Sequence, residues 1–133
     1  MLLQPKKIKY QKVRKGKLNR FKLKSKLDFG NFGLKALESG VVTAKHLNAA
    51  SQAINRKIKK NGKVWLKIYP SLPITKKPTE VRMGKGKGNI SHWATKVRSG
   101  SILFEIIAVN EKIARKAFKT GSAKLPIKTK IFK

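Results

Sequence analysis

The clearest pattern along the chain is an amphipathic repeat in residues 44–60. Its apolar positions recur at steps of three and four residues, the spacing that gathers side chains on one side of an α-helix: Leu47, Ala50, Ile54 and Ile58. Thr43 precedes the repeat as an N-cap, and Asn61-Gly62 follows it as a stop signal. The opposite side is polar, with Lys45, Asn48, Gln52, Asn55, Lys59 and the neighbouring Arg56. The pattern predicts a helix that packs its apolar stripe on a sheet and turns its polar side to solvent or phosphate.

Several shorter segments have the alternation of a β-strand. Residues 63–69 alternate apolar with polar or aromatic side chains, and Pro70 ends the run, which predicts a strand with one buried face. Residues 101–109 predict a further strand, and residues 127–132 predict one that returns at a sheet edge.

Other segments are less regular. Residues 27–37 predict a bent strand or two paired short strands around glycines, and the prolines of residues 72–78 predict an extended connection. Residues 80–82 and 92–97 predict short strands on either side of a glycine-rich segment. That segment is then expected at the tip of a long hairpin.

The elements together predict an α+β fold. Asn110 caps a second predicted helix over residues 111–122. Short links favour a mostly antiparallel sheet, packed with the two helices. We expect a single α+β domain over residues 27–133, a basic N-terminal extension or arm over residues 1–26, and a projecting Gly/Lys loop over residues 82–89.

The charge balance restricts the partners. The 133 residues contain 34 Lys and Arg, two His and only five acids, a formal net charge of +29. The acids are Asp28, Glu38, Glu80, Glu105 and Glu111. Such a surplus predicts a polyanionic partner, RNA or DNA before an acidic membrane surface. No apolar run approaches the roughly 20 residues that cross a bilayer, and the absence of cysteine excludes disulfides, thiolate zinc sites and thiol nucleophiles.

The arm is the most basic segment. Residues 1–26 hold eleven Lys or Arg and no acid, with Tyr10 and Phe21 available to stack on bases. A solvated face or a disordered tail is the alternative reading of such a run. We predict that it binds nucleic acid through Lys6, Lys7, Lys9, Lys12, Arg14, Lys15, Lys17, Arg20, Lys22, Lys24 and Lys26, with Arg56 of the first helix as a further contact.

The Gly/Lys loop is the most distinctive motif. It reads Arg82, Met83, Gly84, Lys85, Gly86, Lys87 and Gly88. Glycine lets the main chain approach a ligand and adopt positive φ, and each lysine adds a mobile charge. Neither the dinucleotide-binding fingerprint nor the triphosphate-binding loop matches its spacing, since Asn89 and Ile90 replace the required residues. The loop therefore predicts phosphate binding, with a flexible solvated hairpin as the alternative.

Catalysis has little support in the sequence. His46 and His92 lie in different predicted elements without an evident carboxylate partner, and no serine has the surroundings of a nucleophile. Each histidine is expected to be a surface residue or a hydrogen-bonding contact to RNA. Metal ligands are absent at a usable spacing, so we predict no enzyme, no metal and no cofactor.

The order of several segments resembles the universal ribosomal protein L-sixteen family of the large subunit. The matching segments are Leu3-Gln4-Pro5-Lys6, Phe29-Gly30 with Phe32-Gly33-Leu34, Gly62-Lys63-Val64-Trp65, Pro73-Ile74-Thr75-Lys76-Lys77-Pro78, Arg82 to Gly88, Gly100 to Glu105, and Lys124-Leu125-Pro126-Ile127-Lys128. The resemblance covers nearly the whole chain, and its start and length indicate the bacterial or organellar form.

This resemblance implies a structural constituent of the large ribosomal subunit. It implies that the arm binds ribosomal RNA and that the loop of residues 82–88 reaches toward the peptidyl transferase region and transfer RNA at the aminoacyl site, with the peptidyl site as a second candidate. Expected partners are large-subunit rRNA, tRNA and neighbouring ribosomal proteins, with no membrane and no homo-oligomer.

The chain departs from the family pattern in its basic residues, and its compartment and function each have an alternative. The family commonly has arginine at positions such as Lys57, Lys59 and Lys67, and lysine gives up bidentate phosphate recognition. The lysine and asparagine bias suits an AT-rich genome, and the blocks of residues 78–82 and 100–105 favour a mitochondrial ribosome over a plastid ribosome or a bacterial cytoplasm. A basic nucleic-acid or membrane-surface binder that works outside any ribosome is the alternative function.

Overall fold

Two antiparallel sheets and two helices make up the part of the chain that the computed structural model describes, residues 3–18, 21–24, 26–59, 62–108 and 110–133. In chain order the elements are β1 (Phe32–Ala36), β2 (Gly40–Thr43), α1 (Ala44–Ile58), β3 (Gly62–Leu66), β4 (Leu72–Lys76), β5 (Asn89–Val97), β6 (Ile102–Ala108), α2 (Glu111–Ser122) and β7 (Thr129–Phe132). The predicted α+β class is confirmed.

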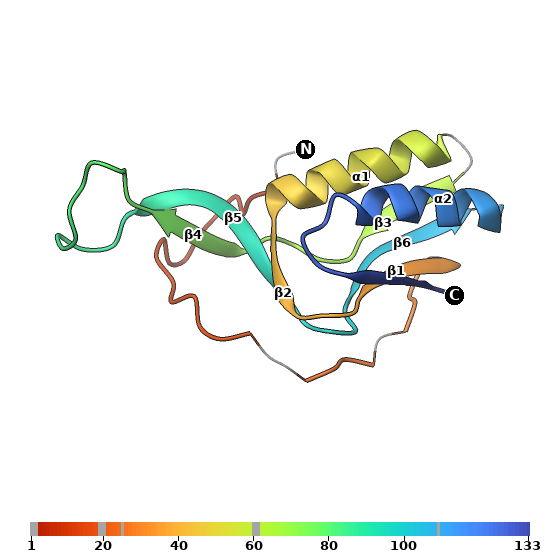
Figure 1. Cartoon of the computed structure of the whole chain (residues 1–133), viewed down its shortest axis with the longest axis horizontal. Coiled ribbons are helices and arrows are strands. Elements are labelled where there is room, and N and C mark those ends of the chain that lie inside the picture. The colour runs from red at the N-terminus through yellow and green to blue at the C-terminus, as the bar shows by residue number, and fades with distance from the viewer. Residues whose placement is uncertain (1–2, 19–20, 25, 60–61, 109) are drawn as a thin grey trace.

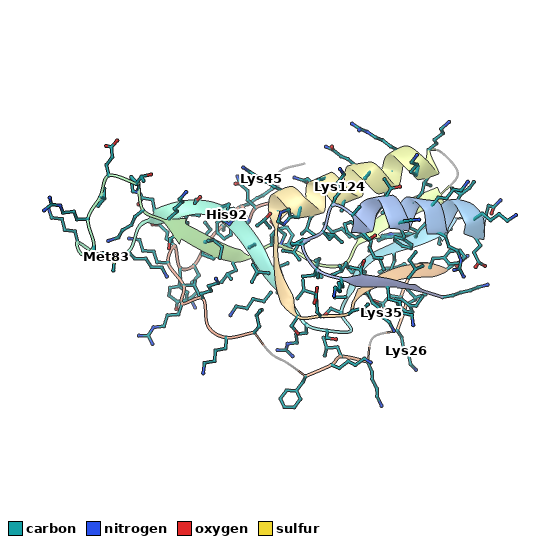
Figure 2. The ribbon with its side chains drawn as sticks, viewed as in Figure 1. Lys26, Lys35, Lys45, Met83, His92 and Lys124 are labelled. Carbon is teal, nitrogen blue, oxygen red and sulfur yellow. The ribbon has the colours of Figure 1, made fainter. Side chains whose placement is uncertain are left out.

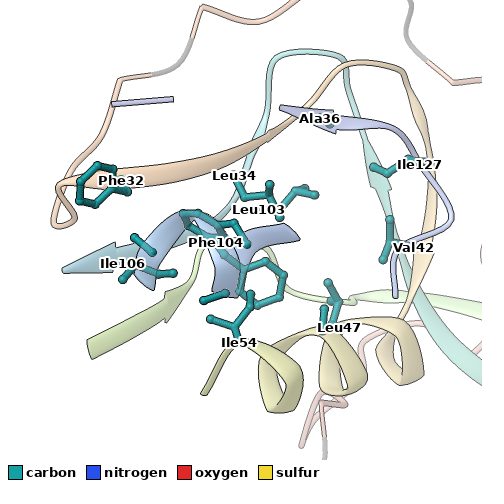
Figure 3. Close-up of a cluster of buried hydrophobic side chains, with 14 of the residues drawn as sticks. Phe32, Leu34, Ala36, Val42, Leu47, Ile54, Leu103, Phe104, Ile106 and Ile127 are labelled. Atoms are coloured by element: carbon teal, nitrogen blue, oxygen red, sulfur yellow. The ribbon is translucent and has the colours of Figure 1, made fainter. Parts of the chain in front are cut away.

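The larger sheet has the strand order β3-β6-β1-β7, and every neighbouring pair is antiparallel. Both helices lie on the same face of this sheet (Figure 1). Leu34 of β1 and Phe104 of β6 are fully buried against Leu47 and Ile54 of α1 (Figure 3). The apolar repeat of the first helix therefore forms one side of the core, as its spacing predicts.

The second sheet has three strands in the order β2-β5-β4. The expectation of an extended connection over residues 72–78 was wrong for its first part, since Leu72–Lys76 forms strand β4. Pro73 is compatible with a strand here because β4 is an edge, so one side of its backbone needs no ladder partner. Strand β2, which leads directly into α1, was not predicted.

The helix boundaries follow the predicted caps. The side chain of Thr43 accepts a hydrogen bond from the His46 amide at 3.3 Å, and His46 Nδ1 accepts one from the Thr43 amide at 3.5 Å. At the other end, α1 stops at Ile58 and Lys59 turns with φ 56°. The predicted ends at Lys60 and Asn61 lie outside the described residues. The second helix and its cap are confirmed, since the Asn110 side chain accepts from the Lys112 amide at 2.9 Å.

Three strand boundaries differ from the sequence prediction. The strand predicted over residues 63–69 runs from Gly62 to Leu66, and residues 67–70 belong to no strand although the Lys67 amide still donates to the Leu103 carbonyl at 3.0 Å. Residues 80–82 form no strand, because a turn over Thr79 and Glu80 interrupts the chain there. The strand expected to begin at His92 begins three residues earlier, at Asn89, where it pairs with Lys76.

Candidate nucleic-acid interface

Residues 77–88 join β4 to β5, and they extend from the end of the three-stranded sheet that lies farthest from α2 (Figure 1). Within this loop, Gly84, Lys85 and Gly86 have φ values of 106°, 52° and 84°. A Cβ added at either glycine would meet nothing within 4 Å. Glycine is therefore needed here for the left-handed backbone rather than for space.

The base of the loop is closed by two local interactions. The Lys77 ammonium donates a hydrogen bond to the backbone carbonyl of Gly84. At Gly88 a Cβ would come within 2.7 Å of the Lys76 carbonyl oxygen, so the two chain segments approach more closely than another residue would allow. These contacts hold the loop in a defined path although it is exposed.

Every residue from Arg82 to Lys87 is exposed, and Gly88 is half-buried. The side chain of Met83 is 98% exposed, and Figure 2 shows it at the far end of the molecule. An apolar side chain in this position contributes nothing to the core. With Arg82, Lys85 and Lys87 nearby, the loop presents cations, glycine backbone and one flexible thioether together.

The arm contacts the loop directly. Lys12 Nζ donates to the Lys87 carbonyl at 2.8 Å, and Lys87 Nζ donates to the Val13 carbonyl at 2.7 Å. Reciprocal hydrogen bonds therefore connect two cationic segments that are far apart in the sequence. Where residues 12–13 meet the loop, cations of the two segments lie close together, and a polyanion there would reduce the repulsion between them.

The arm is also fixed at both of its ends. Leu3 is buried in the core cluster. Toward the other end, the Leu23 amide donates to the Ser99 carbonyl at 2.7 Å. Next to this bond Gly100 has φ 87°, and a Cβ there would lie 2.0 Å from the Leu23 carbonyl oxygen. The arm therefore follows the surface of the domain from the core to the turn between β5 and β6.

The predicted phosphate-binding side chains of the arm are all exposed where the structure describes them. They are Lys6, Lys7, Lys9, Lys12, Arg14, Lys15, Lys17, Lys22, Lys24 and Lys26. Arg20 lies outside the described residues. Arg56 is exposed on α1.

A buried carboxylate anchors the place where the arm enters the domain. Glu105 has no exposed surface, and its carboxylate accepts from the amides of Asp28, Phe29 and Gly30 at 3.3, 2.8 and 3.0 Å. Lys67 Nζ lies 3.8 Å from the same carboxylate. This role was not predicted from the sequence, in which a single glutamate inside an apolar strand was the available signal.

Aromatic and basic side chains gather beside this anchor. The rings of Phe29 and Trp65 stack with centroids 6.1 Å apart, and Lys67 and Lys63 lie over the respective rings at 4.6 and 5.4 Å. Lys67 also donates to the Asp28 carboxylate. That hydrogen bond is the main cause of a pKa of Lys67 above its ordinary value, with smaller contributions from the charges of Asp28 and Glu105 opposed by desolvation.

Both histidines lie close to polar groups of their own neighbours in the sequence. His46 belongs to the capping box of α1, and the ring of His92 is 3.3 Å from the Ser91 hydroxyl. Within the described ranges, no group of three or more histidine, cysteine or acidic residues is arranged to hold a metal ion. No helix of the described chain is long and apolar enough to cross a membrane.

The fold and its many exposed cations are those of a strongly basic α+β protein. The chain belongs to the family described as ribosomal protein L16p/L10e, whose model matches residues 5–132. The resemblance noted in the sequence is thereby confirmed, as is the bacterial or organellar type. A ribosomal protein of this family is not an enzyme, which agrees with the sequence prediction.

Several curated relatives cover almost the whole chain. Each is named large ribosomal subunit protein uL16. The protein of Hyphomonas neptunium is 53% identical over 133 residues, covering 99% of this chain and 96% of its own. The protein of Mesorhizobium japonicum is 52% identical over 130 residues, 97% and 95% of the two chains. That of Wigglesworthia glossinidia brevipalpis is 49% identical over 128 residues, 96% and 94%.

Proposed function

We propose that this protein is a structural constituent of the large ribosomal subunit, where it binds large-subunit rRNA and contacts tRNA during translation. The family match over residues 5–132 carries this proposal. The net charge of +29 supports RNA as the partner, because phosphates would neutralise a surface that otherwise repels itself. Neighbouring ribosomal proteins are further partners, and the protein acts as a single copy without a membrane.

The arm supplies most of the rRNA contacts in this proposal. Its ten described cations are exposed along a path that runs over the domain, a geometry that suits the neutralisation of successive phosphates. Arg56 adds a contact on the helix side. Such contacts position the protein on RNA without reading its sequence.

The loop of residues 82–88 contacts tRNA at the aminoacyl site near the peptidyl transferase region, with the peptidyl site as a second candidate. Support comes from its exposed cations and from Met83 at the far end of the molecule. Because Lys87 is hydrogen-bonded to the arm at Val13, the loop is braced by the segment that binds rRNA. We therefore expect Lys85 to act mainly on tRNA and Lys87 to act on both tRNA binding and loop position.

Charge-neutralising variants test this division. Lys85→Gln in reconstituted large subunits should impair tRNA accommodation more than subunit incorporation, because the arm and domain keep most phosphate contacts. Lys17→Gln, an exposed arm variant, is the matched control and should affect accommodation no more than incorporation. Equal loss of both by Lys85→Gln would contradict the tRNA role. Recovery of the wild-type chain free of large subunits after sedimentation at moderate salt would contradict the ribosomal role altogether.

The compartment is a separate part of the proposal. The blocks of residues 78–82 and 100–105 favour a mitochondrial matrix ribosome, whereas the lysine and asparagine bias suits any AT-rich genome, with a plastid ribosome or a bacterial cytoplasm as the alternative. The three relatives described above are from bacteria and give this assignment no support, whereas a bacterial cytoplasm fits them. Identification of the genome that encodes the chain would decide the question directly.

A further inference from the structure

A groove of about 650 Å³ lies between α1 and the strand β3, at the opposite side of the core from β7. Neutral polar side chains of α1 line one wall: Asn48, Ser51, Gln52 and Asn55. The other wall consists of residues 64–69, among them Trp65 and Tyr69. Leu3 lines the groove as well. Its volume falls in the range of small-ligand sites.

The groove differs from the remaining surface in charge. Lys67 is the one charged residue among its described lining residues, and its ammonium is paired with Asp28 and lies 3.8 Å from Glu105. Exposed cations stand nearby at both ends of α1, Lys45 at the start and Arg56 and Lys59 at the end. By helix geometry, Lys45 and Lys59 are roughly 21 Å apart. A neutral centre is thus flanked by positive charge.

We infer that this groove receives unpaired bases of a single-stranded RNA segment, with its phosphates directed to the flanking cations. This inference rests on the proposed function, since it specifies what part of an RNA the α1 side of the protein binds. A base is neutral and flat, and its edges carry donors and acceptors that Gln and Asn amides complement. Phosphates would favour unpaired cations in the groove itself, whereas its one described cation, Lys67, is already paired with Asp28 and lies 3.8 Å from Glu105.

The wall formed by residues 64–69 adds a surface for stacking. Tyr69 is 49% exposed and borders the groove, so its ring is accessible to a base. Gln52 and Asn55 are also exposed, about one turn apart on α1. Both can therefore be substituted without disturbing the buried stripe of the helix. Unpaired bases are also the part of ribosomal-type RNA that proteins read by hydrogen bonding and stacking, because the narrow major groove of its duplex is closed to side chains.

Binding of the full-length chain to two probes tests the inference. One probe is a short single-stranded RNA of mixed sequence, and the other is an RNA duplex with the same number of phosphates. The wild type should prefer the single strand. The double variant Gln52→Leu with Asn55→Leu should lose this preference by about tenfold, with an unchanged salt dependence, because it removes base contacts and no charge. Tyr69→Leu should act in the same direction.

Arg56→Gln provides the matched control on the same helix. It should weaken binding of both probes, reduce the slope of log K against log salt by about 0.7 on the single strand, and leave the preference in place. Retention of the wild-type preference by the groove variant, or a changed salt slope, overturns the inference. A wild type that binds neither probe would instead overturn the proposed function, so the two failures are distinguishable.

Replacement of Gln52 by a photoreactive phenylalanine derivative in reconstituted subunits identifies the occupant. A crosslink to a nucleotide agrees with the inference. A crosslink to a peptide would assign the groove to a neighbouring protein, one that pairs with β3 at the edge of the sheet. The absence of any crosslink would indicate that the groove is empty. Either of these results overturns the RNA assignment.

Discussion

Substitution of Glu105 by glutamine should destabilise the domain far more than its conservative chemistry suggests. Glutamine keeps the volume of the side chain but removes the charge. Its oxygen can still accept from Phe29 and Gly30, the two amides that share one carboxylate oxygen at 2.8 and 3.0 Å. Its NH₂ group would then face the Asp28 amide, a donor against a donor, where the carboxylate now accepts at 3.3 Å.

The magnitude follows from these three bonds. Loss of the Asp28 bond leaves a partly buried donor unsatisfied, which costs about 1 kcal/mol or more. The two remaining bonds change from charged to neutral acceptors, which are roughly half as strong. Relief of a buried charge offsets part of this loss. We expect a net decrease of about 2 kcal/mol in the free energy of unfolding.

Glu111 offers a control with the same substitution. Its carboxylate is exposed and pairs with Arg115 one turn away at 2.7 Å, a surface interaction of about 0.3–0.5 kcal/mol. Urea unfolding followed by circular dichroism, at a salt concentration that screens the net charge, measures both variants. Amide hydrogen exchange at Asp28, the amide that loses its acceptor, should rise in the Glu105→Gln variant only. Equal, small losses for the two variants would refute the anchoring role of Glu105.

Three further outcomes are expected. Gly100→Ala should lower the melting temperature more than Gly86→Ala: the two glycines have similar φ values of 87° and 84°, but only at Gly100 would a Cβ strike backbone, 2.0 Å from the Leu23 carbonyl oxygen. Equal shifts would show that the arm contact is dispensable. Asp28→Asn should lower the pKa of Lys67, measured by NMR titration, since the Asp28 hydrogen bond is the main cause that raises it. The stability from this pair should be present below pH 10.5 and disappear as the pH rises through the folded-state pKa of Lys67; an unchanged titration would exclude the pair. The isolated chain should gain secondary structure as salt rises, because screening reduces the repulsion of a +29 charge, and a flat circular dichroism series would argue against this.

The residues that make up the candidate site could be predicted from the sequence, but the contacts between them could not. Arg82 to Gly88 and the basic arm were identified as sequence motifs, because charge and glycine content are visible without a structure. Their contact through Lys12 and Lys87 was not, since those residues are 75 positions apart. Glu105 was recognised as one of five acids, but its three amide donors come from a segment more than 70 residues earlier.

The two helices and the α+β class could be predicted from the chain's residues alone, as could the large positive charge from which a polyanionic partner is expected. Those features depend on local spacing, on caps such as Thr43 and Asn110, and on a sum of charges. The division of the strands into two sheets, the strand at Leu72–Lys76 and the part of His46 in a helix cap became visible in the folded chain alone. The difference arises because the hydrogen bonds of a helix join residues four positions apart, so local sequence is enough to predict it. A strand bonds to segments far away in the sequence, and local patterns do not show which segments these are.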